Sequence, residues 1–146
     1  MLTRSAQLLA LVCALWLLPL PAHAGDKVAP DDIAGIWTLV IPEAFPGYYY
    51  AWRINADGTY QEDGWNRQTG YPIQQTLTGR WTTDGKKLKL SQEGIPYVFE
   101  GSRVGNAING KLYLNGKDVS RFCAQQGDTP PDRCDQSVAA AQLIAP

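Results

Sequence analysis

The chain has 146 residues, 45% of them hydrophobic, and its 13 Lys and Arg against 14 Asp and Glu give a net charge of −1. This near-neutral balance argues against nucleic acid or an anionic membrane surface as a partner. The single histidine is His23, in a segment that we expect to be removed, so the remaining chain offers no imidazole for a nucleophile system or a metal site. We therefore expect no catalytic residues, no metal and no cofactor. An isomerase or cyclase that uses Tyr or carboxylate groups is the enzymatic alternative.

The N-terminus predicts a secretory signal peptide over residues 1–24. Arg4 precedes an apolar run from Leu8 to Leu20, and Ala22-His23-Ala24 forms a small-x-small cleavage site. The apolar run is too short to span a membrane, and no second run follows it. Removing Arg4 leaves 12 Lys and Arg against 14 Asp and Glu, a net charge of −2. We expect residues 25–146 to form one exported domain, periplasmic or secreted.

The body of the chain has the pattern of strands joined by turns. Short runs rich in Trp, Tyr, Val, Ile and Thr are separated by Gly, Pro, Asn-Gly and Asp-Gly. Asp84-Gly85 and Asn115-Gly116 are the clearest two-residue hairpin turns, since both central positions favour positive φ. We predict eight strands: Gly35–Ile41, Tyr48–Asn55, Thr59–Trp65, Ile73–Thr82, Lys86–Gln92, Tyr97–Arg103, Ala107–Leu114 and Lys117–Ala124.

Within several of these runs apolar and polar residues alternate. Leu88 and Leu90, for example, alternate with lysines, which indicates that one face is buried and the other is in water. Sequential hairpins give an antiparallel meander, and eight strands can close on themselves and remove the exposed edges. The fold class that we predict is an all-β, up-and-down barrel.

Two cysteines lie beyond residue 24, Cys123 and Cys134, separated by a turn-rich spacer. In an exported chain we expect them to form a structural disulfide rather than a redox or metal-binding pair. Closing this loop constrains the unfolded chain by about 3 kcal/mol. Beyond it, Asp135 is a candidate cap for a short helix over Gln136–Leu143, and an irregular tail is the alternative.

The segment Ala34-Gly35-Ile36-Trp37 resembles the Gly-x-Trp that opens the first strand of lipocalins and other calycin barrels. In lipocalins an arginine near the end of the last strand covers this tryptophan at the closed end of the barrel, and Arg121 stands at a similar place here. The resemblance implies a lipocalin-like barrel in which Trp37 is buried with Arg121 over its indole face. Such a contact contributes about 0.5–2 kcal/mol.

The densest aromatic run in the chain, Tyr48-Tyr49-Tyr50 followed by Trp52, predicts one wall of the barrel interior. Tyr and Trp combine flat apolar area with a polar tip, which suits a pocket for a ring-containing or amphipathic ligand. The alternative is that these rings simply fill a small barrel. We expect a cavity entered between residues 42–47 and 64–72, with little charge inside. Its predicted ligand-binding residues are Tyr48, Tyr50, Trp52, Gln75, Trp81, Tyr97 and Phe99.

Asp57, Glu62 and Asp63 form an acidic cluster, which we interpret as solvated surface rather than as a calcium or acid–base site. Phe45, Trp65 and Tyr71 fall in or beside predicted rim loops. Exposed aromatic residues in such loops are typical of contact surfaces, and packing onto the outside of the barrel is the alternative for them.

Two functions compete. The first is a non-catalytic barrel that binds a small apolar or aromatic molecule. The second is a protein-interaction module, such as a protease or lysozyme inhibitor, that acts through its rim loops. A filled interior with exposed Phe45, Trp65 and Tyr71 would favour the second.

Overall fold

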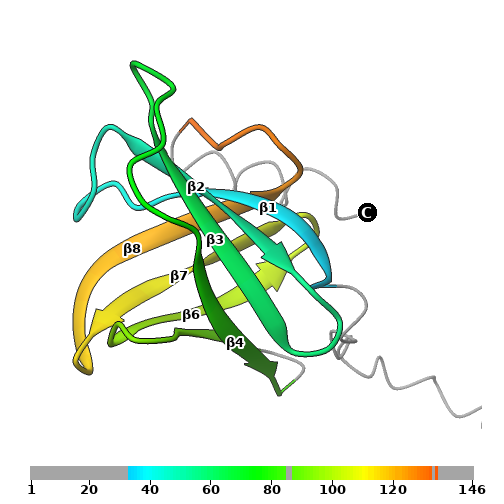
Figure 1. The fold of residues 1–146 in the computed structure, drawn as a ribbon. Helices are drawn as coiled ribbons and strands as arrows, with labels where there is room; N and C mark the ends of the chain where they lie inside the picture. The colour runs from blue at the N-terminus through cyan, green and yellow to red at the C-terminus, as the bar shows by residue number, and fades with distance from the viewer. Residues whose placement is uncertain (1–32, 85–86, 133, 135–146) are drawn as a thin grey trace, which may run out of the picture.

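The computed structural model describes residues 33–84, 87–132 and 134, and within these residues eight strands form one closed antiparallel barrel (Figure 1). Each strand pairs with the next along the chain, and the last pairs with the first, as the meander predicts. The strands are β1 (Gly35–Val40), β2 (Tyr48–Ile54), β3 (Thr59–Asn66), β4 (Leu77–Thr83), β5 (Leu88–Gln92), β6 (Tyr97–Val104), β7 (Ala107–Leu114) and β8 (Lys117–Gln126). The predicted all-β up-and-down barrel is confirmed.

Two predictions fall outside the described part of the chain. They are the signal peptide over residues 1–24 and the C-terminal helix over Gln136–Leu143. Among the residues that the structure describes, no helix has the length and apolar character needed to cross a membrane.

The predicted fourth strand began four residues too early. Residues 73–76 belong to the connection between β3 and β4, which folds back on β3: Trp65 bridges to Pro72, and the Ile73 amide donates to the Gly64 carbonyl at 2.9 Å. Residues 73–76 are therefore not part of a strand, and the alternation predicted for them does not apply. As a result Gln75 is exposed and Gln74 is the half-buried residue.

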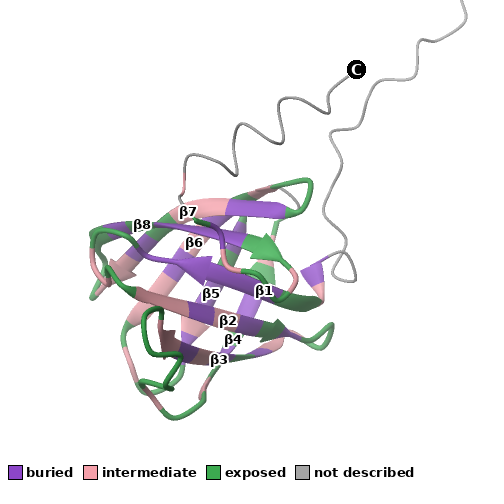
Figure 2. Ribbon diagram, turned by 90° about the horizontal axis from the view of Figure 1, so that it is seen from above, coloured by how far each residue is buried: buried purple, intermediate pink, exposed green. Residues whose placement is uncertain are grey.

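Aromatic rings form the core of one half of the barrel, and Figure 2 shows that every strand label lies on or beside segments of the ribbon that include buried residues. Trp52, Phe99 and Phe122 meet edge to face, with ring centroids 5.0 to 5.4 Å apart. Gly101 and Gly110 face each other across β6 and β7, and a Cβ at Gly101 would lie 2.9 Å from the Phe122 ring. The two glycines therefore make room for that ring.

Trp37 lies at this packed end, fully buried, and its indole Nε1 donates to the Ile33 carbonyl at 2.8 Å. The prediction that Arg121 covers it is wrong, because the guanidinium over the indole belongs to Arg103, 5.5 Å from the ring centroid. β8 continues to Gln126, which is the residue that pairs with Trp37. Arg121 is therefore in the middle of β8, on the outer face, and lies toward the opposite end of the barrel.

The predicted disulfide between Cys123 and Cys134 is confirmed, with Cα atoms 5.2 Å apart. It returns the segment after β8 along the outside of β1, where the Thr38 hydroxyl lies 2.7 Å from the Thr129 carbonyl. The disulfide thus joins the end of the described chain to the barrel wall near the connection between β1 and β2.

Candidate functional site

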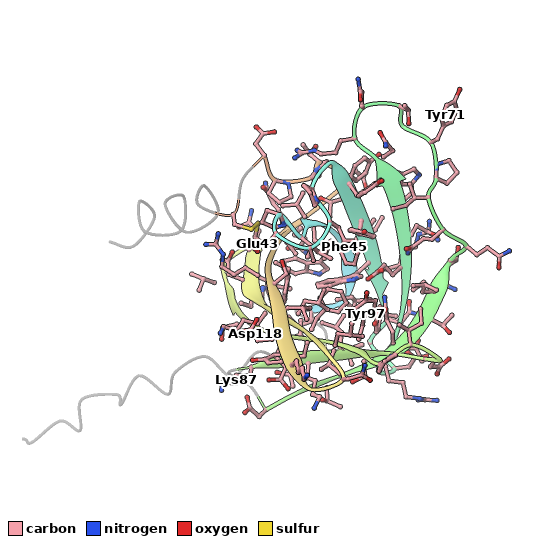
Figure 3. All side chains as sticks on the ribbon, turned by 90° about the vertical axis from the view of Figure 1, so that its left-hand side faces the viewer. Glu43, Phe45, Tyr71, Lys87, Tyr97 and Asp118 are labelled. Atoms are coloured by element: carbon pink, nitrogen blue, oxygen red, sulfur yellow. A yellow bond between two sulfur atoms is a disulfide. The ribbon has the colours of Figure 1, made fainter. Side chains whose placement is uncertain are left out.

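A cavity of about 270 Å³ occupies the other half of the barrel. The connections β1–β2, β3–β4, β5–β6 and β7–β8 all lie at this end, which Figure 3 views with Phe45 and Tyr97 near the centre. Its volume is just below the range typical of sites for drug-sized ligands, so it suits a small molecule. The lining residues are Ile41, Phe45, Tyr48, Tyr50, Glu62, Ile73, Gln74, Leu77, Gln92, Ile95, Tyr97, Phe99 and Leu112.

Aromatic side chains form two walls of the cavity. Tyr48 and Tyr50 come from β2, and Tyr97 and Phe99 come from β6. The side chains at alternate positions of a strand point to the same face, so each pair follows directly from its strand. Gly64 on β3 faces Tyr50, and a Cβ there would lie 2.8 Å from the ring, so this glycine lets the Tyr50 ring pack against β3.

Phe45 covers the cavity from the β1–β2 connection. Its ring meets Tyr50 and Tyr97 edge to face, with centroids 6.1 Å and 6.2 Å away. We expected Phe45 to be an exposed rim residue, but it is half-buried and packs against the core. It lines the cavity and packs against Tyr50 and Tyr97.

Glu43 anchors the same connection to β8. Its carboxylate accepts hydrogen bonds from the Ser120 hydroxyl at 2.8 Å, the Arg121 amide at 2.9 Å and the Arg121 Nε at 2.8 Å. Partial burial raises the pKa of Glu43, but the hydrogen bonds from Ser120 and Arg121 and the charge of Arg121 outweigh it and lower the pKa to about 2. This ion pair, and not a contact with Trp37, is the role of Arg121.

The inner end of the cavity holds a buried carboxyl group, that of Glu62 on β3. Glu62 is 3% exposed, and it accepts hydrogen bonds from Trp52 Nε1 at 2.8 Å and from Gln74 Nε2 at 3.3 Å. Burial raises its pKa, while these bonds and one with the Gln92 side chain act in the opposite direction. Our interpretation of Glu62 as solvated surface is wrong, because its side chain is buried at the inner end of the cavity.

The alternation of β3 explains the error. Tyr60, Glu62 and Gly64 are the buried residues of that strand and face inward. Because Glu62 is polar and Gly64 has no side chain, the hydrophobic pattern of the sequence does not show which face of β3 points inward. The signal that could have found it is position, since Glu62 is two residues after an aromatic residue in a strand.

Gln92 on β5 brings a second polar group to the cavity. It continues the inward series Leu88, Leu90, Gln92 and is 8% exposed. Its side-chain oxygen Oε1 is buried without a hydrogen-bond donor among the described residues. A buried amide oxygen without a donor is uncommon and marks a place where a ligand or water group completes the bonding.

The structure brings together four of the seven predicted ligand-binding residues around the cavity: Tyr48, Tyr50, Tyr97 and Phe99. Trp52 lies beneath the cavity and contacts Glu62. Trp81 lies toward the packed end, where its Nε1 donates to the Asn55 carbonyl at 2.8 Å. Gln75 is exposed, and its neighbour Gln74 has the expected place.

The remaining rim residues lie outside the cavity. Trp65 stacks on Tyr49 on the outer face of the sheet, with ring centroids 5.2 Å apart, so the alternative of packing onto the barrel's outside holds for it. Tyr71 is 72% exposed and points away from the barrel at the tip of the β3–β4 connection (Figure 3).

Within the described ranges, no three His, Cys, Asp or Glu side chains gather as a metal site would require. No protein-family model matches the sequence, and a search of curated proteins finds no match. The barrel and the side chains of its cavity are therefore the basis for assigning a function.

Proposed function

We propose that this protein is an exported, non-catalytic, lipocalin-like barrel that binds a small aromatic molecule in the cavity at its open end. The observation that carries this proposal is the cavity itself, about 270 Å³ with aromatic walls on β2 and β6. A mostly apolar concavity with a few polar groups is the usual form of a small-molecule site. The disulfide and the signal-like N-terminus support export.

The experiment is an NMR titration with benzyl alcohol, a neutral ring with one short substituent. We expect binding in roughly the millimolar range, with chemical-shift changes at Tyr50, Tyr97 and Phe99. Ile73→Trp should fill the mouth and weaken binding at least about tenfold. Ile36→Trp is the matched control, because Ile36 is 41% exposed on β1 without lining the cavity and Ile73 is 40% exposed at its edge.

A second candidate, a protein-interaction module, is favoured by Tyr71, which is exposed beside the Tyr49–Trp65 stack. Shift changes confined to the exposed residues 67–71, or equal effects of the two Trp substitutions, would count against the cavity and favour this surface.

A further inference from the structure

We propose that the cavity selects a cationic ligand, an aromatic or short aliphatic primary amine whose ammonium group binds between the Glu62 carboxylate and Gln92 Oε1. This inference rests on the proposed function, because it names the ligand class of the same cavity. Three observations carry it, and each concerns a different part of the lining.

The first observation is the balance of charge. Glu62 is an acidic side chain inside an apolar cavity, and none of the described residues that line this cavity is Lys, Arg or His. A buried carboxylate is costly unless a cation or hydrogen bonds compensate it. The neighbouring Asp63 points outward and pairs there with Arg53 at 3.0 Å, so that guanidinium serves the outer face. In its ionised form Glu62 therefore has no counter-charge among the described lining residues, and a cationic ligand would supply one.

The second observation is the balance of hydrogen bonds. Trp52 and Gln74 already donate to Glu62, and Gln92 Oε1 has no donor within the part of the chain that the structure describes. The inner end of the cavity thus offers a ligand two acceptor groups, the Glu62 carboxylate and Gln92 Oε1. An ammonium group supplies three donors and no acceptor, so it can bond to both groups, whereas a carbonyl or carboxylate ligand would place a further acceptor beside them.

The third observation is the aromatic lining. Tyr48, Tyr50, Tyr97 and Phe99 line the space in front of Glu62. The faces of aromatic rings attract cations, and this attraction strengthens where water is excluded. The same rings offer apolar area to the remainder of the ligand, so an amine attached to a ring or short chain fits both ends of the cavity.

Binding should also displace a proton. Burial raises the pKa of Glu62, so the free protein holds a proton there at pH values where an exposed carboxyl has lost it. The other titratable groups around the cavity are the phenols of Tyr48 and Tyr50 on β2 and Tyr97 on β6, with Tyr60 behind Glu62 on β3. β4, β5 and β7 contribute Leu77, Gln92 and Leu112, which do not titrate. An ammonium that binds as a cation therefore leaves a carboxylate beside it and releases the Glu62 proton to solvent.

The test compares benzylamine with benzyl alcohol on the intact protein. Benzylamine is an ammonium at neutral pH, as Lys is, and the two probes have nearly the same shape. We expect benzylamine to bind at least about tenfold more tightly. Calorimetry at a series of pH values above about 4.5, each in two buffers of different ionisation enthalpy, should show proton release for the amine within that series and none for the alcohol.

Glu62→Gln should remove the preference for the amine over the alcohol. Glu100→Gln is the matched control, because that carboxylate faces outward in an ion pair with Lys89 at 3.5 Å, and it should retain the preference. Should Glu62→Gln fail to fold, the preference and the proton release of the wild type still test the inference.

The outcomes separate the two proposals. If benzyl alcohol binds and benzylamine binds no more tightly, or if binding of the amine releases no proton, the amine inference is overturned and the binding cavity stands. If neither probe reaches the cavity, the proposed function fails and the inference fails with it.

Discussion

At the scale of single residues, Glu62 and Trp37 show opposite consequences of burial in this barrel. Burial of Trp37 stabilises the fold, since its large apolar surface leaves water and its one polar atom donates a hydrogen bond to the Ile33 carbonyl. Burial of the charged form of Glu62 destabilises the fold, because the carboxylate is desolvated. Hydrogen bonds from Trp52 and Gln74 offset only part of this cost. One residue stabilises the fold, and the other is kept at the expense of stability.

The cost of Glu62 depends on pH in a defined direction. Its pKa in the folded state lies above the value of 4.5 that is usual for Glu, so as the pH rises past about 4.5 the unfolded state loses this proton first. The free energy of unfolding then falls until the pH reaches the folded-state pKa. Glu62→Gln should remove this loss, so the variant should gain stability relative to the wild type between pH 4 and pH 7, roughly.

Urea denaturation of Glu62→Gln and of the wild type, at about pH 4 and at about pH 7, measures this difference in the free energy of unfolding. Glu100→Gln, which removes an outward carboxylate, is the control for a change in net charge. A stability difference between Glu62→Gln and the wild type that is the same at both pH values would contradict the assignment of Glu62 as a buried acid.

Trp37 should be a major contributor to stability. Trp37→Ala removes a fully buried ring together with its hydrogen bond, and it should lower the free energy of unfolding by about 3–5 kcal/mol. Trp65→Ala is the matched comparison, since that ring is half-buried on the outer face. Chemical denaturation of both variants measures the two losses, and equal losses would show that Trp37 is not a core residue.

At the scale of one element, the β1–β2 connection combines an anchor with a cover. Glu43 joins it to β8 through Ser120 and Arg121, and Phe45, two residues later, packs over the cavity. The Ala44 amide also donates to the Ser120 hydroxyl at 3.3 Å. Because anchor and cover are this close in the chain, loss of the anchor should loosen the cover.

The anchor should weaken in acid. The folded-state pKa of Glu43 is about 2, below its usual value of 4.5, so its contribution to stability is present above about pH 4.5 and is lost as the pH falls toward 2. Glu43→Gln should lower the melting temperature at pH 6, roughly, and the difference from the wild type should shrink at pH 2.5, roughly. The effect should be small, because the Glu43 side chain is 44% exposed and solvent screens the pair. A melting-temperature difference that grows in acid would contradict this role.

At the scale of the whole molecule, the barrel divides its interior between two tasks. The half around Trp37, Trp52 and Phe122 is filled by rings in contact, and the half toward the β1–β2 connection holds the cavity. Eight strands leave limited internal space, and the cavity occupies the part of it that the side chains of this half leave unfilled. The filled-barrel and open-barrel alternatives are each right for one half.

The disulfide contributes to the stability of the whole fold. In the chain that begins at Gly25, titration without a reductant should find no free thiol, because Cys123 and Cys134 are bonded to each other. Reduction should lower the free energy of unfolding by about 3 kcal/mol through the larger entropy of the unfolded chain. Urea denaturation with and without reductant measures this loss, and two titratable thiols before reduction would contradict the bond.

The architecture could be predicted from the sequence because its signals are local. Asn115 adopts φ of 50° and Gly116 adopts φ of 75°, as the Asn-Gly hairpin between β7 and β8 requires. Alternation fixes the face of each regular strand, so the sequence alone places Tyr48, Tyr50, Tyr97 and Phe99 inside the barrel.

Only the tertiary structure decided the features that depend on contacts between distant segments. The β3–β4 connection folds back onto β3, and as a result Gln74 lines the cavity in place of the predicted Gln75. The length of β8 beyond residue 124 put Arg121 with Glu43 and left Trp37 to Arg103. Glu62 on β3 and Gln92 on β5 face the interior, and because both are polar the hydrophobic pattern does not identify these positions as buried. Only closure of the barrel determines which groups these side chains contact. Their partners lie on other strands, and the alternation within one strand does not give its position relative to the others.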